Sequence, residues 1–476
     1  MKSPRKAVAA ATGGGDTVDL YELRRKVYPR AVSGWFAGWR WVMVWLTQLV
    51  FYGLPWLQWN GRQAVLFDLE SRRFFIFGLV LHPQDFIYLT GLLVISAMAL
   101  FLFTTVAGRL WCGYACPQTV YTEIFLWIER RIEGDRFRRM KLDAAPMSAR
   151  KFALKAAKHG AWILFSLWTG FTFVGYFTPI VELGGLVATA ALGPWQTFWI
   201  LFYGFATYGN AGFMREQVCK YMCPYARFQG VMFDRDTLII TYDKGRGEPR
   251  GSRSRKADPA MLGLGSCIDC GLCVEACPTG IDIREGLQLE CIGCAACIDA
   301  CDAVMGKMNY APGLIRYDTE NGMQNRWSRA QLWRRVVRPR VLVYTTVLLV
   351  ATIALVGHMV TRTPLKLDII RDRGTLGREV DEGMIENVYR LQLTNSTEEP
   401  RSYVLSVSGI DTVFIDSQAE FDVDAAGNRT VPVRVRIQPD TGVPGTHTIY
   451  FGVSDLDDPD VSVREKTTFY VPHQAR

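Results

Sequence analysis

Residues 267–278 read CIDCGLCVEACP, and residues 291–301 read CIGCAACIDAC. Each stretch is a run of the form C-x2-C-x2-C-x3-C, whose first three thiolates can hold three corners of one iron–sulfur cube. The fourth cysteine of each run then reaches the cube of the other run. The two runs therefore predict a small domain, at about residues 260–312, that is built around two four-iron, four-sulfur clusters.

The crossed pattern assigns every ligand and predicts a bacterial-type two-cluster ferredoxin domain. Zinc also binds paired C-x2-C ligands, but eight cysteines within 35 residues in this repeated triplet favour iron–sulfur clusters. One departure is that Asp302 stands where a proline follows the first run. The predicted ligands of cluster 1 are Cys267, Cys270, Cys273 and Cys301, and those of cluster 2 are Cys291, Cys294, Cys297 and Cys277.

A second cysteine motif, C-x3-C-P, occurs twice. In LWCGYACPQTV, residues 110–120, it supplies Cys112 and Cys116, and an offset of 107 residues leads to Cys219 and Cys223. If the local backbone is helical, both sulfurs of each pair lie on one face. Two repeated halves would then gather four thiols at one place.

Several roles are open for these four thiols, which we call the quartet. They can be buried apolar side chains, as free cysteines often are. Because the motif and its proline occur twice, we favour a functional site, which is a third iron–sulfur cluster, a thiol/disulfide redox pair or a copper site. Thiolates are soft ligands and select Cu(I) over harder ions.

Five apolar stretches are each long enough to cross a bilayer, which takes about 20 residues. Arg40 lies inside the first, where we expect it to snorkel to the membrane interface. The expected spans are residues 37–57, 85–106, 159–181, 195–213 and 341–360. They divide the chain into an N-terminal arm (1–34), a four-span membrane region (35–213) with a basic loop (107–158), a segment with the ferredoxin domain (214–340), a fifth helix (341–360) and a C-terminal domain (361–476).

The basic residues predict the orientation of these spans. The loop at 107–158 contains ERRIEGDRFRRMK, whereas the loop at 182–194 has no Lys or Arg, so the basic loop, the N-terminus and the ferredoxin domain are expected in the cytoplasm. Five spans then place the C-terminal domain on the other, extracytoplasmic side of the membrane. All 12 cysteines precede that domain, as expected if it faces an oxidising compartment.

The C-terminal domain is predicted to be an immunoglobulin-like β-sandwich. Its stretches VYRLQLTN, SYVLSVSG, TVPVRVRIQ, GTHTIYFGVSD and KTTFYVP alternate apolar and polar residues between turn-forming residues. In the ferredoxin segment, the basic stretch at 243–259 is expected to be a flexible linker attracted to lipid headgroups or a redox partner. We expect no nucleic-acid partner.

The spans, the two C-x3-C-P motifs, the ferredoxin insert and the outer β-domain together resemble the cytochrome c oxidase accessory protein family, CcoG, also called FixG or RdxA. The resemblance covers nearly the whole chain. It implies a bacterial inner-membrane protein that helps to assemble cbb3-type cytochrome c oxidase by reducing Cu(II) to Cu(I). It also implies contact with membrane lipid and with oxidase assembly factors.

The predicted mechanism is an electron relay. Electrons from an unknown donor, either cytoplasmic or a quinol, enter the two clusters and pass to the quartet, where Cu(II) becomes Cu(I) for a copper-exporting ATPase or chaperone. Two alternatives are an electron-transfer subunit that exchanges electrons with quinol and has no metal substrate, and a non-enzymatic scaffold for oxidase assembly.

Overall fold

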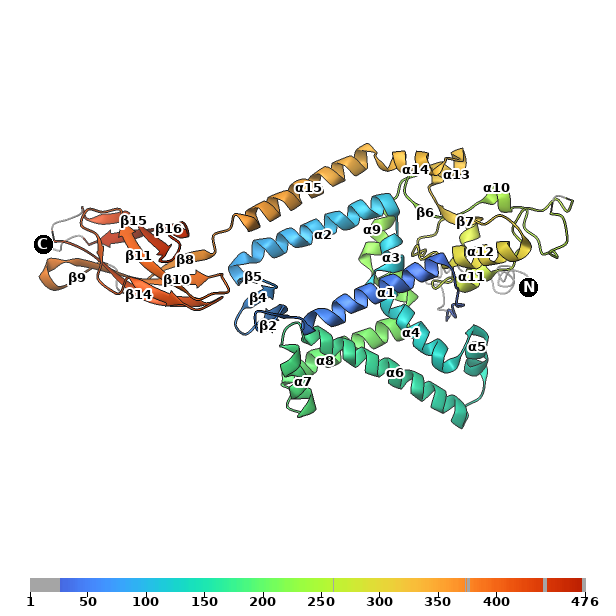
Figure 1. Cartoon of the computed structure of the whole chain (residues 1–476), viewed down its shortest axis with the longest axis horizontal. Helices are drawn as coiled ribbons and strands as arrows, with labels where there is room; N and C mark the ends of the chain where they lie inside the picture. Colours follow the sequence, from blue (N-terminus) through green and yellow to red (C-terminus); the bar gives the residue numbers. More distant parts are fainter. Residues whose placement is uncertain (1–25, 260, 373, 375–376, 440–442, 473–476) are drawn as a thin grey trace, which may run out of the picture.

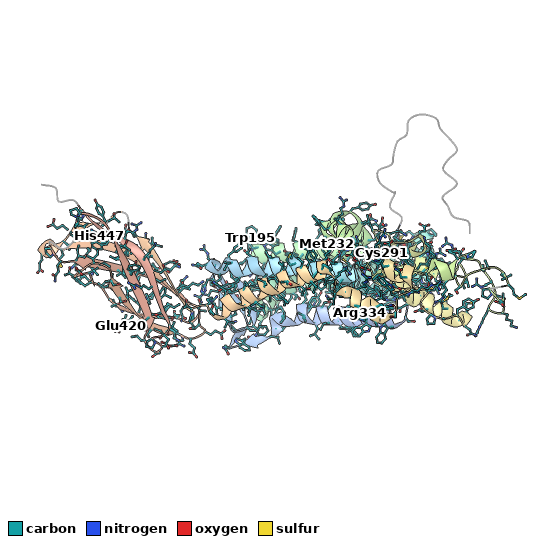
Figure 2. The ribbon with its side chains drawn as sticks, turned by 90° about the horizontal axis from the view of Figure 1, so that it is seen from above. Trp195, Met232, Cys291, Arg334, Glu420 and His447 are labelled. Atoms are coloured by element: carbon teal, nitrogen blue, oxygen red, sulfur yellow. The ribbon has the colours of Figure 1, made fainter. Side chains whose placement is uncertain are left out.

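The protein is elongated, with the ferredoxin segment at one end, helices in the middle and the β-domain at the other end (Figure 1). The computed structural model describes residues 26–259, 261–372, 374, 377–439 and 443–472. Residues 1–25 of the predicted N-terminal arm therefore lie outside the described residues. Figure 2 shows Cys291 far from Glu420 and His447, which lie in the β-domain.

Among the residues that the structure describes, two helices are long and apolar enough to cross a membrane. They are Pro83–Ala107, which contains α2 (Phe86–Ala107), and α15 (Pro339–Val360). Only 6% of the apolar window of each is buried, so neither is the core helix of a soluble domain. The two helices pack side by side (Figure 1), where the Tyr88 hydroxyl lies 2.8 Å from Nδ1 of His358.

The other three expected spans correspond to helices that do not meet the same measure of length and hydropathy, and the count of five stays a prediction. The helix at the third span begins ten residues early, where Ser148 accepts a hydrogen bond from the Lys151 amide, and its first half is basic. The helices are α1 (Trp35–Gly53), α6 (Ala149–Val174) and α8 (Pro194–Thr207), the last continued by a π-helix at Tyr208–Met214.

Short elements that the sequence did not reveal connect these helices. Strands β1 and β2 pair with each other, and β3, β4 and β5 form a second small sheet between α1 and α2. Helix α7 (Ile180–Ala188) follows α6 after a turn. The strands are β1 (Gln58–Trp59), β2 (Arg62–Gln63), β3 (Val65–Asp68), β4 (Arg73–Ile76) and β5 (Leu79–Leu81).

The basic loop at 107–158 is largely helical and partly buried. Glu129 of α4 is 1% exposed and contacts Arg139 at 3.1 Å, Arg215 at 3.0 Å and Lys158 at 4.0 Å. These charges, which the sequence alone would place on a solvated surface, therefore form an internal ion network. It connects α4 to α5, to α6 and to the segment that contains Arg215. The helices of the loop are α3 (Leu110–Tyr114), α4 (Pro117–Glu133) and α5 (Arg136–Ala144).

The ferredoxin domain is bounded by a pair of antiparallel strands, β6 (Ile239–Tyr242) and β7 (Ile315–Asp318). Helices α11 (Leu272–Ala276) and α12 (Ala296–Met308) pack together between them. The expectation of a flexible linker at 243–259 is wrong, because Arg253 donates to the carbonyl of Gly265 at 2.7 Å and Arg246 donates to that of Pro312 at 3.0 Å. These arginines bind their own domain.

The ferredoxin domain is docked firmly on α1. Asp299 of α12, which is 6% exposed, accepts hydrogen bonds from the amides of Phe36 at 3.2 Å and Ala37 at 2.7 Å. A carboxylate at these first amides satisfies donors that have no partner within the helix and complements the helix dipole. The ferredoxin domain therefore caps the first predicted span.

The C-terminal domain is the predicted immunoglobulin-like sandwich. One sheet has the order β12-β14-β10-β8 and the other β13-β11-β15-β16, with alternate residues such as Tyr389, Val433 and Phe451 in the core between them. The five quoted stretches correspond to β10, β11, β14, β15 and β16. The bounds are β8 (Leu365–Arg371), β9 (Arg378–Glu379), β10 (Ile385–Asn395), β11 (Arg401–Ser408), β12 (Phe414–Ile415), β13 (Glu420–Val423), β14 (Asn428–Ile437), β15 (Gly445–Asp455) and β16 (Ser462–Val471).

Candidate iron–sulfur and thiol centre

The cysteine runs of the ferredoxin domain coil around two cavities. Asp269 and Gly271 in the first run have positive φ angles of 52° and 68°, and Gly293 and Ala295 at the same places in the second run have 69° and 58°. Such left-handed turns are rare outside glycine. Here they wind each run tightly enough for its cysteines to converge, so the two runs are structural repeats.

The cysteines are grouped as the crossed pattern predicts. One cavity is lined by Cys267, Cys270, Cys273 and Cys301. The second is lined by Cys277, Cys291, Cys294 and Cys297, and Cys273 lies between the two. This placement supports the assignment of ligands, which stays a prediction for the individual residues.

The donors in both cavities fit iron–sulfur clusters. No carboxylate is found among the described residues that line either cavity, so thiols are the only strong metal ligands there. Burial raises the pKa of Cys273, Cys291 and Cys301 to about 12 and that of Cys294 to about 11. Without metal these thiols hold their protons at neutral pH, and a cluster must displace them.

The quartet cysteines lie in three kinds of local structure. Cys112 lies in α3, and Cys219 lies in a π-helix at Val218–Met222. Cys116 and Cys223 instead precede the first residue of α4 and of α9 (Pro224–Met232), with extended backbones. The expectation of one helix through each pair is therefore wrong, because a residue before proline is driven out of the α conformation.

The four thiols nevertheless lie near one another. Burial raises the pKa of Cys112 to about 11 and that of Cys219 to about 12, and electrostatic repulsion between the quartet thiolates adds to both shifts. Gln229 of α9 is fully buried and donates a hydrogen bond to the Cys112 sulfur at 3.3 Å. Gln229 therefore links Cys112 of the first motif to the helix that follows the second motif.

The quartet is not arranged as a closed site for a single ion. In the described part of the chain, no three His, Cys, Asp or Glu side chains surround one point closely enough for that. The ferredoxin cysteines do not surround a single point either, because the ligands of a four-iron cluster lie farther apart than the ligands of one ion. A metal at the quartet therefore requires either a cluster or closure of the thiols around an ion.

The quartet lies directly against the predicted cluster 2. A Cβ atom added to Gly113 would come within 2.7 Å of the Gly293 carbonyl oxygen and 2.8 Å of the Cys294 backbone. Cys112 and Cys219 pack on the apolar cluster that contains Cys294. The backbone of α3 and the Cys294 loop therefore connect the two thiol sites directly.

Two arginines that the sequence did not reveal as site residues support this contact. Arg40 is 9% exposed and donates to the Cys294 carbonyl at 2.6 Å, so the expectation that it snorkels to the interface is wrong. Arg109 donates to the Leu289 carbonyl and, at 3.4 Å, to that of Cys291. For Arg40 the sequence did contain a signal, because an arginine within an apolar span commonly marks a functional site.

Three family models match the chain. The model described as "4Fe-4S dicluster domain" matches residues 214–320, and the "4Fe-4S binding domain" matches residues 89–134. The model of the "IG-like fold at C-terminal of FixG" matches residues 355–472. The two iron–sulfur matches include the ferredoxin cysteines and all four quartet cysteines.

Known proteins are similar over most of the chain. Nitrogen fixation protein FixG of Rhizobium meliloti is 39% identical in an alignment of 458 positions that covers 89% of this chain and 86% of that protein. Protein RdxA of Cereibacter sphaeroides is 39% identical in an alignment of 435 positions that covers 89% of this chain and 91% of that protein. A crystal structure of a FixG-related protein from Vibrio parahaemolyticus is 26% identical over 23% of this chain and 96% of its own, with a TM-score of 0.21. Because the chain is 39% identical to these relatives and the alignments cover most of both chains, it belongs to the FixG/RdxA family of iron–sulfur proteins.

Proposed function

We propose that this chain is a membrane-bound iron–sulfur oxidoreductase that reduces Cu(II) to Cu(I) for the assembly of cbb3-type cytochrome c oxidase. Two four-iron, four-sulfur clusters, held by the two crossed sets of ferredoxin cysteines, supply one-electron redox chemistry. Cys112, Cys116, Cys219 and Cys223 receive the copper ion.

The close approach of the quartet to the Cys294 loop is the observation that carries this proposal. Backbone atoms of α3 and of the loop after Gly293 are in direct contact, and apolar side chains surround them. A Cu(II) ion held by the four partly buried thiolates would accept an electron from this direction, and the soft thiolates stabilise the product Cu(I) over Cu(II). Because burial favours the protonated thiol, the bound ion must replace the protons.

We base the proposed placement of the protein in the membrane on the basic loops and on the two exposed apolar helices. The protein spans the bacterial inner membrane with five helices, its N-terminus and ferredoxin domain face the cytoplasm, and its β-domain faces the periplasm. Cu(I) then leaves the quartet on the cytoplasmic side, toward a copper-exporting ATPase or chaperone. Oxidase assembly factors are the proposed partners of the β-domain.

A double variant tests the role of the quartet. Cys112→Ser with Cys116→Ser removes two soft ligands and preserves side-chain size, while all ferredoxin cysteines remain. We expect the variant to keep the parental iron content and to lose Cu(II) reduction, measured with a Cu(I)-specific chelator after reduction by dithionite and its removal. Trp111→Phe is a control next to the motif and should reduce copper normally. Unchanged copper reduction in the double variant would refute the role of these thiols.

A second candidate for the quartet is a third iron–sulfur cluster, with copper reduced elsewhere. The match of residues 89–134 to a 4Fe-4S binding domain favours it, because that segment contains Cys112 and Cys116. The iron content separates the two candidates. Two clusters give about eight iron atoms per chain and three give about twelve. Loss of one third of the iron in the double variant would assign the quartet to a cluster.

A further inference from the structure

A cavity lies where the predicted membrane helices meet the ferredoxin domain. Its wall includes Arg40 and Trp41 of α1, Glu123 and Arg130 of α4, and Cys294. Its volume is about 90 Å³, several times the roughly 10–15 Å³ that one ordered water requires. A ligand in this cavity would therefore touch a predicted ligand of cluster 2.

Two charged side chains of α4 are available to such a ligand. Glu123 and Arg130 are seven residues apart, so they lie on the same face of the helix, two turns from each other. Arg139 and Arg215 on the same wall are engaged by Glu129 at 3.1 and 3.0 Å. Within the described residues, neither Glu123 nor Arg130 is in a salt bridge, and the charge of Glu123 acts on Arg40 of the same wall. Glu123 also lies close enough to Cys294 to affect its thiol electrostatically.

An aromatic groove continues from the cavity. Trp41, Trp45 and Trp127 line it together with Arg130 and Arg131, so Trp41 and Arg130 belong to both the groove and the cavity. Trp45 is 69% exposed and Trp127 is 41% exposed. Exposed tryptophans beside arginines are typical of the level where a membrane meets water. The groove therefore links the cavity to the expected lipid surface.

We propose that the cavity binds the ring of a membrane quinol and that the groove holds the start of its isoprenoid tail. This inference rests on the proposed function, for which it names the electron donor. Oxidation of one quinol to a quinone breaks two O–H bonds and releases two protons and two electrons. Each of the two clusters that the crossed cysteine sets would hold would accept one electron, and the carboxylates of Glu123 and Glu216 on the cavity wall would take the protons. Arg130 donates a hydrogen bond to a ring oxygen.

Cys219 of the quartet also lines the cavity, but the charge of the wall argues against free Cu(II) as the occupant of the cavity itself. A dication is repelled by an excess of arginines over carboxylates. An amphiphile with an apolar tail uses both the polar cavity and the tryptophan groove. Among the described residues that line the cavity, the arginines are Arg30, Arg40, Arg130, Arg139 and Arg215, and the carboxylates are those of Glu123 and Glu216.

Binding is measured first, by quenching of tryptophan fluorescence when decylubiquinone is added to the full-length protein in lipid nanodiscs. Arg130→Gln should weaken binding about ten-fold or more, because it removes a charged hydrogen-bond donor. Glu123→Gln should leave binding within about two-fold, since the amide can still accept a hydrogen bond. Arg138→Gln, an exposed arginine of α5 outside the cavity, is the matched control and should bind as the parent does.

Electron exchange is measured second, as reoxidation of dithionite-reduced clusters by decylubiquinone. Glu123→Gln should slow it by about 100-fold, as expected when a proton-transfer group is lost, and Arg138→Gln should not. Equal binding and equal rates in all variants would overturn the site, and reduction of the clusters by a reduced flavin with no exchange with quinone would overturn the occupant. Reduction of Cu(II) by dithionite-reduced protein needs no quinone, so its failure beside normal quinone exchange would refute only the proposed copper function.

Discussion

Replacing Gly113 by alanine perturbs the contact between the quartet and the Cys294 loop with a single methyl group. The added Cβ would lie 2.7 Å from the Gly293 carbonyl oxygen, whereas ordinary van der Waals contact begins at 3.4 Å, so the two backbones must separate by about 0.7 Å. Overpacking of this kind costs about 1–3 kcal/mol. The obstacle is backbone rather than a flexible side chain, so no rotamer change relieves it.

Gly160→Ala in α6 is the matched control, because its Cβ would meet nothing within 4 Å. Alanine in the interior of a helix is more stable than glycine by about 0.5–1 kcal/mol. Gly113 also lies in a helix, so this gain is common to both variants and the overpacking cost remains as the difference. The free energies of unfolding of the two variants should then differ by about 2 kcal/mol, which is roughly 6 °C in Tm at about 3 °C per kcal/mol.

The assay for Gly113→Ala is thermal bleaching of the cluster absorbance, together with the rate of Cu(I) formation by pre-reduced protein. We expect a lower Tm and slower copper reduction than in Gly160→Ala, because the relay contact has widened. If Gly113→Ala melts with the control and reduces copper at the parental rate, the close approach of α3 to the Cys294 loop is not part of the working protein.

Three further predictions address other parts of the chain. Glu129→Gln leaves buried cations without their anion and should lower the free energy of unfolding by about 3–5 kcal/mol, measured by denaturant titration; a loss under 1 kcal/mol would contradict a buried network. Burial raises the pKa of Cys112 and Cys219 to about 11 and 12, so their protons compete with metal and Cu(I) affinity should rise with pH across the neutral range; affinity that falls with pH would contradict this competition. Glu398→Ala removes the acceptor that holds the β-domain to the β1–β2 hairpin and should speed limited proteolysis between α15 and β8, whereas Glu399→Ala, at a side chain 76% exposed, should not; equal rates would contradict a fixed domain.

The elements best predicted from the sequence are those whose pattern is local. The β-sandwich strands alternate apolar and polar residues, and each of the five quoted stretches became a strand. The cysteine spacing likewise brought the eight ferredoxin cysteines into two groups, because short loops between ligands allow few other arrangements. The strands β8, β9, β12 and β13 were missed; β9, β12 and β13 are short, and β8 closely follows the fifth predicted span.

The features that escaped prediction depend on tertiary contacts. The charges of the loop at 107–158 look solvated in sequence, and only packing of α4 against α6 and Arg215 makes them an internal network. Arg40 donates a hydrogen bond to the carbonyl of Cys294, which lies 254 positions later in the chain. The second C-x3-C-P motif is not one continuous α-helix, because Val218–Met222 form a π-helix and Pro224 favours an extended backbone at Cys223. Its two thiols therefore do not lie on one face of an α-helix.

The relay from the clusters to copper is tested most directly by one anaerobic stopped-flow measurement. Protein reduced by dithionite, and then freed of it, is mixed with Cu(II) and a Cu(I)-specific chelator, and the cluster absorbance and the Cu(I) signal are recorded together. We predict that the clusters reoxidise at the rate at which Cu(I) appears, with one Cu(I) formed for each electron lost. Clusters that stay reduced, or Cu(I) that forms while they do, would contradict the relay.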